Sequence, residues 1–119
     1  MFSDDQGEAR LPTALWIEAE CAKLNARGQG HYIAHRGNHA SGVVMVKVYD
    51  ITVRQCMLYA QQRDLDGALG WVRALGDDPM PEGQVDQYTQ RAVSLDPDLW
   101  VVEIEAQSLD NPFDGKVFD

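Results

Sequence analysis

The chain has 119 residues, 45% of them hydrophobic, which is enough for a single domain with one core. Its net charge of −9 arises in residues 61–119, where thirteen acidic residues stand against four basic ones, and it argues against binding to nucleic acid or to an anionic membrane. No apolar run approaches the ~20 residues that span a bilayer and the N-terminus does not resemble a signal peptide, so a cytoplasmic protein is expected.

The first predicted element is a helix that begins near Leu11. Residues 1–10 before it contain few apolar side chains and are predicted to be disordered. Thr13 is the candidate N-cap, and Gly28 suits the C-terminal end of the helix. Two apolar stripes run along the helix, so we expect it to be half embedded in the core, with Trp16 beside one of them.

Four strands are predicted after this helix, over residues 31–36, 43–49, 54–62 and 69–75. In the second strand Lys47 interrupts alternating valines, and it is therefore expected to reach water on the opposite face. The connection from Asp50 to Val53 lacks the Asn-Gly or Asp-Gly pair of a tight hairpin, so a looser turn or a bulge is expected there.

A second helix and a closing strand complete the predicted domain. Asp78 can cap the helix, and Pro97 ends it. In the strand that follows, alternate residues are expected to face the core and water, with Trp100 inside and Glu103 outside. The tail, residues 106–119, either docks its phenylalanines on the domain or stays mobile.

The order α-β-β-β-β-α-β over residues 11–105 predicts a single α+β domain. This order suggests a mainly antiparallel sheet with the two helices packed on one face. Cys21 and Cys56 lie on different elements in apolar surroundings, without a Cys-x-x-Cys pair. They are predicted to be buried thiols in a reducing compartment.

One cluster of residues could bind a metal, namely His31, His35 and His39. His31 and His35 are expected to share a strand face, and His39 lies in a loop beyond Gly37 that could fold back toward them. A three-histidine metal site is therefore one alternative. Surface or packed histidines are the simpler interpretation, and no cofactor is expected.

No nucleophile elbow, phosphate-binding loop or dinucleotide motif occurs in the sequence. The paired acidic residues fit helix caps, turns and an exposed strand face better than a calcium loop. We therefore predict a non-catalytic interaction or regulatory module, and an enzyme is the less favoured reading. The alternative is a small enzyme or metal-binding protein that uses the three histidines.

Three basic side chains are the candidates for a partner or ligand surface. Arg36, Lys47 and Arg54 belong to residues 1–60, where six acidic and six basic residues cancel. If they converge, they form the least negative patch on the molecule, suited to an acidic protein partner or a small anionic ligand. The competing interpretation is that they lie on two faces of the sheet and only balance local charge.

Three stretches of the sequence resemble the signature of a known family. They are Arg10-Leu-Pro-Thr-Ala-Leu-Trp-Ile-Glu-Ala, Gly42-Val-Val-Met-Val-Lys-Val and Asp96-Pro-Asp-Leu-Trp-Val-Val-Glu-Ile-Glu. They are similar to a family of short bacterial proteins catalogued as domain of unknown function 1491. That family usually has an Asp-Gly turn after the valine strand, where this chain has Thr52-Val53. The resemblance implies a fold and a family but no activity and no site residue.

Overall fold

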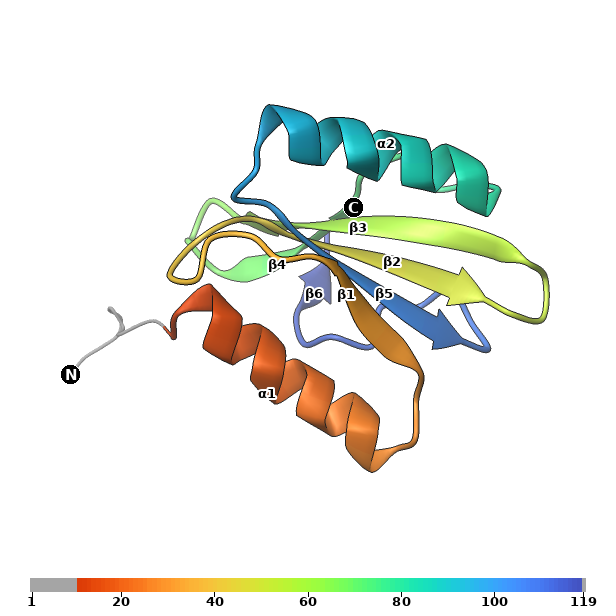
Figure 1. The fold of residues 1–119 in the computed structure, drawn as a ribbon, viewed down its shortest axis with the longest axis horizontal. Helices are drawn as coiled ribbons and strands as arrows, with labels where there is room; N and C mark the ends of the chain where they lie inside the picture. Colours follow the sequence, from red (N-terminus) through yellow and green to blue (C-terminus); the bar gives the residue numbers. More distant parts are fainter. Residues whose placement is uncertain (1–10, 119) are drawn as a thin grey trace.

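Two helices and six strands build residues 11–118, the part of the chain that the computed structural model describes (Figure 1). The elements are α1 (Thr13–Ala26), β1 (His31–His35), β2 (Val44–Asp50), β3 (Gln55–Arg63), β4 (Leu69–Arg73), α2 (Glu82–Leu95), β5 (Trp100–Ala106) and β6 (Lys116–Val117). The expected order α-β-β-β-β-α-β is confirmed, with a short sixth strand added. The expectation for residues 1–10 falls outside the described residues.

The strands form one mixed sheet in the order β1-β5-β2-β3-β4-β6. Its β1–β5, β2–β3 and β3–β4 pairs are antiparallel, which confirms a mainly antiparallel sheet. The β2–β5 and β4–β6 pairs are parallel. β5 lies between β1 and β2, and its pairing with β2 runs from Val44 opposite Trp100 to Asp50 opposite Ala106. The closing strand thus joins two strands from the first half of the chain.

The two helices cover opposite faces of this sheet, and Figure 1 shows α2 above it and α1 below it. Successive side chains of a strand point to opposite faces. Val44 and Val46 therefore pack on the α1 side, whereas Met45 packs on the α2 side. Val101 of β5, expected to face water, is buried in the α2-side core. The expectation that both helices lie on one face is therefore wrong, because both faces of the central strands are apolar.

Each helix begins directly after a proline. α1 starts at Thr13 after Pro12, and α2 starts at Glu82 after Pro81, with no side-chain cap at either position. Neither Thr13 nor Asp78 therefore acts as the expected N-cap. A proline has a fixed φ that suits the start of a helix. At α1, the first backbone N–H groups instead donate to carbonyls of the loop after β1.

The β2–β3 connection is looser than a two-residue hairpin, as expected. Asp50 Oδ1 accepts hydrogen bonds from the backbone N–H of Thr52 at 2.8 Å and from its hydroxyl at 2.6 Å. Arg54 closes the loop in the left-handed region, with φ of 57°, and its N–H donates to the Asp50 carbonyl at 2.8 Å. The Asp50 side chain thus stabilises this turn, as an Asp-Gly pair does in tighter turns.

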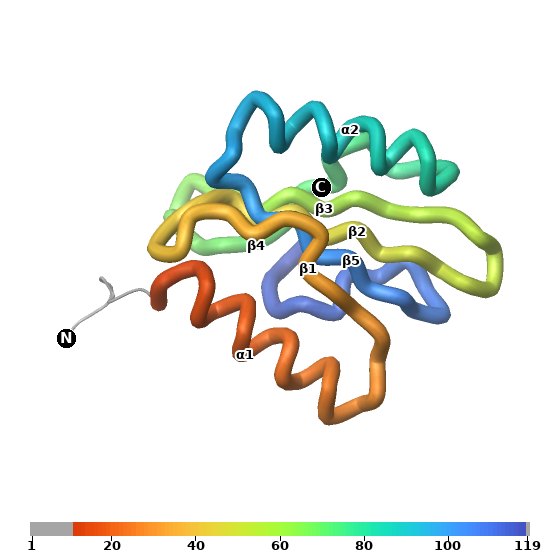
Figure 2. Tube along the Cα trace, in the orientation of Figure 1, coloured from red at the N-terminus to blue at the C-terminus, as the bar shows by residue number. Residues whose placement is uncertain are grey.

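The segment after β5 returns to the α1 side of the sheet, as the chain trace in Figure 2 shows. The Phe113 ring is buried, with its centroid 5.8 Å from that of Trp16 and 6.4 Å from that of Trp71. The carboxylate of buried Glu20 accepts a hydrogen bond from the Asp114 backbone N–H at 2.8 Å. These contacts make the segment part of the α1-side core.

Candidate functional site

Lys47, in the middle of β2, is only 2% exposed. Its side chain points toward α2, where Nζ lies 2.7 Å from Asp86 Oδ1, 2.9 Å from Glu82 Oε2 and 3.3 Å from Glu103 Oε1. The expectation that this lysine reaches water is therefore wrong. α2 covers that face of the sheet, and carboxylate oxygens take the place of water around the ammonium group.

Local geometry explains why these three carboxylates meet at one point. Glu82 and Asp86 stand four residues apart on α2 and so project from the same side of the helix. Glu103 is the residue of β5 directly paired with Lys47 of β2, and it also pairs with Tyr32 of β1. The sheet register and the helix spacing together therefore build the cluster.

The cluster fixes the protonation state of its lysine. Burial opposes the positive charge of Lys47, but hydrogen bonds to Asp86 and Glu82 and the charge of Glu103 outweigh it, so its pKa lies above the ordinary value. A lysine that acts as a nucleophile needs a lowered pKa. Three carboxylates minus one ammonium leave a formal charge of −2 at this point. The lysine is thus a structural counter-ion rather than a reactive group.

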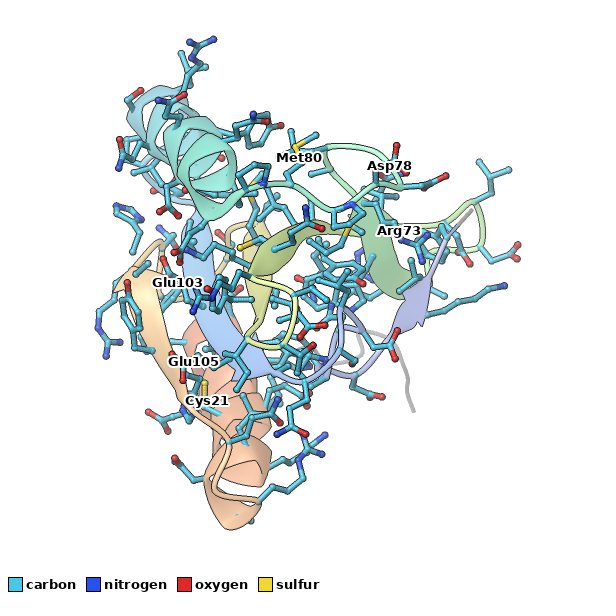
Figure 3. All side chains as sticks on the ribbon, turned by 90° about the vertical axis from the view of Figure 1, so that its right-hand side faces the viewer. Cys21, Arg73, Asp78, Met80, Glu103 and Glu105 are labelled. Carbon is cyan, nitrogen blue, oxygen red and sulfur yellow. The ribbon has the colours of Figure 1, made fainter. Side chains whose placement is uncertain are left out.

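Two adjoining hollows, of about 380 and 400 Å³, lie between β1 and α2, and both are bordered by Tyr32 and Glu103. Figure 3 labels Glu103 on β5, beside β1 and below α2. We call this region the β1–α2 groove. Its lining residues are His31, Tyr32, Ala34, His35, Tyr49, Glu82, Asp86, Thr89, Gln90, Val93, Val101, Glu103, Ile104 and Glu105.

The β1–α2 groove combines acidic and aromatic groups. Four carboxylates line it, and among the described residues no lysine or arginine does. Tyr32 is 59% exposed, and a hydrogen bond with Glu103 raises the pKa of its phenol. Tyr49 shares the smaller hollow with Tyr32. Carboxylates and aromatic rings together are the groups that recognise ammonium and guanidinium cations.

The three basic candidates do not form one patch. Arg36 follows β1, whose last residue is paired with Val101 at the start of β5. Arg54 precedes β3 and lies beyond Asp50, which is paired with the end of β5. Arg36 and Arg54 are therefore at opposite ends of the sheet, and Lys47 is buried between them. A surface for an acidic partner or an anionic ligand is not assembled from these residues.

The histidines are also separated. His31 is paired with Ile104, which faces the α1 side, whereas His35 is paired with Val101, which faces the α2 side. The expected shared face is wrong because a bulge between Ile33 and His35 shifts the register of β1. His31 Nδ1 lies 3.0 Å from the Gln29 carbonyl oxygen and His35 Nδ1 lies 2.8 Å from that of Leu99. Within residues 11–118 no group of three or more histidine, cysteine, aspartate or glutamate side chains is arranged to hold a metal ion.

Zinc or nickel at micromolar concentration is therefore expected to leave the melting temperature of the chain unchanged. Only a ligand that binds the folded state more tightly than the unfolded state raises it. Thermal unfolding followed by circular dichroism, with and without metal, checks this. A rise in melting temperature that disappears in His35→Ala would establish a histidine site and contradict the geometry.

The two cysteines differ in exposure. Cys56 is 1% exposed on the α2 side, and burial raises its pKa to about 11. Cys21 is only half-buried, and burial followed by the nearby charge of Glu20 raises the pKa of its thiol. Both shifts favour the unreactive thiol form.

Cys56 is accordingly expected to react with Ellman's reagent only as the chain unfolds. The side chain is 1% exposed, and its pKa of about 11 keeps the thiol protonated near neutral pH, so both access and thiolate are scarce in the folded chain. The rate is measured in Cys21→Ala, which leaves Cys56 as the single thiol, with and without urea. A native-state rate close to that of a free thiol would show that Cys56 is accessible.

A larger hollow, of about 660 Å³, lies near the start of α1. Its walls are mostly apolar and include Leu11, Trp16, Val43 and Leu69, with Arg63 as a charged side chain at the edge. The polar residues Thr13, Ser41, Gln61 and Gln62 also line it. Size alone does not make this hollow the better candidate, because charged groups orient a ligand: among the described residues Arg63 is the one charged group of this hollow, whereas four carboxylates line the β1–α2 groove.

Comparison with known proteins settles the family. The model of a family described as protein of unknown function (DUF1491) matches residues 11–114. The chain belongs to the DUF1491 family. The resemblance noted in the sequence is thereby confirmed. No curated protein matches the chain.

Solved structures agree with this assignment. The crystal structure of a DUF1491 family protein from Caulobacter crescentus CB15 is 28% identical, with a TM-score of 0.83 over 92% of this chain and 100% of that one. An NMR structure of a DUF1491 family protein from the same organism is 28% identical, with a TM-score of 0.79 over 92% and 97% of the two chains.

A more distant structure shows the fold alone. The solution structure of protein Atu0922 from A. tumefaciens is 18% identical, with a TM-score of 0.68 over 87% and 92% of the two chains.

In this DUF1491 protein, neither of the helices within residues 11–118 has the length and apolar character needed to cross a membrane.

Proposed function

We propose that this DUF1491 protein is a non-catalytic interaction module whose binding surface is the β1–α2 groove. The observation that carries the proposal is the meeting of two hollows at Tyr32 and Glu103, above a carboxylate cluster that Lys47 neutralises only in part. The partner is a protein that presents cationic side chains to this groove. The unpaired thiols of Cys21 and Cys56 in this chain support a cytoplasmic setting.

The buried lysine suits a binding role because it holds the carboxylates in place. Its ammonium group is hydrogen-bonded to Glu82 and Asp86, and these side chains remain 49% and 39% exposed. Their positions are therefore set before a partner arrives, while part of each carboxylate can still accept a new donor. Pre-set groups lose less conformational entropy on binding, and a negative groove attracts a positive partner from solution.

Several features support binding over catalysis. The raised pKa of Lys47 keeps the amine protonated. The Cys56 thiol is buried, with a pKa of about 11. Each of the two strand histidines has one ring nitrogen next to a backbone carbonyl. A nucleophile, a general base and a third group that orients the base are the arrangement that covalent catalysis needs, and these groups do not provide it.

The experiment compares proteins captured from a lysate of the host bacterium by tagged wild-type chain and by charge variants. Glu105→Lys reverses an exposed carboxylate of the groove that does not contact Lys47. Glu18→Lys makes the same change on the exposed surface of α1, on the other side of the sheet. A partner of the groove is expected to be retained by Glu18→Lys and reduced about tenfold by Glu105→Lys, a loss of ~1.4 kcal/mol.

Tyr32→Ala extends the comparison to the aromatic part of the groove, and it is expected to weaken capture of the same protein. Circular dichroism of each variant shows that the fold is intact. If wild type and all three variants capture the same proteins in the same amounts, the groove is not the binding surface and the proposal fails.

A further inference from the structure

β1 is an edge strand of the sheet, with β5 as its neighbour among the described strands. The Gly30 carbonyl accepts a hydrogen bond from the Glu105 N–H at 2.9 Å. In an antiparallel pair, residues that bond to the neighbouring strand alternate with residues whose N–H and C=O point away from it. The backbone N–H and C=O of Tyr32 therefore bond to β5, and the backbone N–H and C=O groups of His31 and Ile33 point outward. Within residues 11–118 no backbone partner of these outward groups is found.

This free edge borders the β1–α2 groove. Tyr32, between the two outward-pointing residues, is paired with Glu103 and lies between the two hollows. A strand added to β1 would run about 4.8 Å outside it, and every second side chain of that strand would lie on the α2 side. These side chains would be spaced by roughly 7 Å along the groove. They would come close to the carboxylates of Asp86 and Glu103.

We infer that β1 accepts an extended, basic segment of a partner protein as an added strand, whose alternate lysine or arginine side chains enter the β1–α2 groove. The inference rests on the proposed function and names the kind of segment that is bound. Backbone hydrogen bonds to His31 and Ile33 supply affinity in such a complex, and the groove selects the side chains.

Charge favours this occupant over a second copy of the chain. A second copy would bring its own β1 and with it another groove lined by carboxylates, on a chain with a net charge of −9. Like charges in an interface cost free energy. The bulge after Ile33 also limits the free edge to a short stretch, which disfavours open-ended strand pairing between copies.

The test uses a synthetic heptapeptide with lysine at alternate positions between valines and threonines, and a matched peptide with glutamate in place of lysine. Each is titrated into the ¹⁵N-labelled full chain, and amide exchange is followed by NMR. At a lysine-peptide concentration about ten times Kd, the His31 and Ile33 amides are expected to exchange roughly tenfold more slowly. The glutamate peptide is expected to cause no protection.

Two variants make the result specific. His31→Pro removes an outward N–H at the first position of the strand, where proline is tolerated without loss of the β1–β5 hydrogen bonds. It is expected to weaken binding of the lysine peptide about tenfold. Glu105→Gln, with Glu18→Gln as its matched control, is expected to weaken binding through the groove. The spectrum of each variant shows whether the chain is folded.

Each outcome decides between the claims. Protection of the His31 and Ile33 amides in the wild type, with loss of the Ile33 protection in His31→Pro, supports strand addition. Peptide-induced shifts around Tyr32 and Glu103 without protection of these amides overturn strand addition but leave the groove as a binding surface. No shift with the lysine peptide overturns the inference for basic segments, while the lysate comparison still tests the proposed function on its own.

Discussion

Trp100→Ala is expected to lower the free energy of unfolding by about 3–5 kcal/mol, a large share of the stability of a small domain. The indole is 3% exposed in the α1-side core, and its Nε1–H donates a hydrogen bond to the Asn38 carbonyl at 2.8 Å. The truncation therefore opens a cavity and leaves the Asn38 carbonyl without its partner. Urea titrations of wild type and variant measure the loss.

Glu105→Ala is the matched control for this prediction, because Glu105 is an exposed residue of the same strand. It is expected to change stability by less than about 0.5 kcal/mol. Similar losses for the two variants would show that Trp100 does not anchor β5 in the core.

Lys47→Met is expected to lower the free energy of unfolding by about 2–3 kcal/mol. Removing one partner of a buried ion pair costs about 3–5 kcal/mol. The lower figure applies here because the carboxylates of Glu82 and Asp86 are 49% and 39% exposed and can regain water. Lys116→Met, which removes an exposed lysine of β6, is expected to have little effect.

A double-mutant cycle with Glu103→Gln isolates the contact between β2 and β5. Lys47 Nζ and Glu103 Oε1 are 3.3 Å apart. The summed losses of unfolding free energy in Lys47→Met and Glu103→Gln are therefore expected to exceed the loss in the double variant by about 1–2 kcal/mol in urea titrations. Additive losses would mean that Lys47 and Glu103 do not interact in solution.

The pKa of Lys47 also predicts how its contribution depends on pH. A lysine whose pKa is raised by folding stabilises the protein fully below its unfolded value of 10.5, and this stabilisation is lost as the pH rises through the folded value. The difference in unfolding free energy between wild type and Lys47→Met is therefore expected to stay constant from neutral pH to about pH 10 and to shrink above that. A difference that already shrinks near neutral pH would contradict the ion cluster.

The helices and strands could be predicted from the sequence because their signals are local. Alternating valines define β2, and Pro97 marks the end of α2, so the two helices and strands β1 to β5 are predicted within a few residues, whereas the two-residue β6 is not. The layer arrangement does not follow from the alternation, because an alternating strand predicts one wet face and hence both helices on the other. Val101 next to Val102 was the available signal, since consecutive apolar residues in a strand are typical of burial on both sides.

The candidate site could not be predicted because its parts come from distant positions. Lys47 meets Glu103 only through the β2–β5 register, and Asp86 only because α2 lies across that face. A lysine within a valine strand could have signalled a buried ion pair, had the second face been known to be covered. The bulge that turns His35 away from His31 leaves no comparable local signal.

The most direct measurement of the central claim is site-specific crosslinking in the host cell, with a photoreactive amino acid at Tyr32 in the β1–α2 groove or at Leu69 in the 660 Å³ hollow. Both side chains are exposed, so each position can report a contact. A crosslinked protein is expected at position 32, with the attachment point mapped by mass spectrometry to a basic, extended segment. A partner crosslinked at position 69 and absent at position 32 would contradict it.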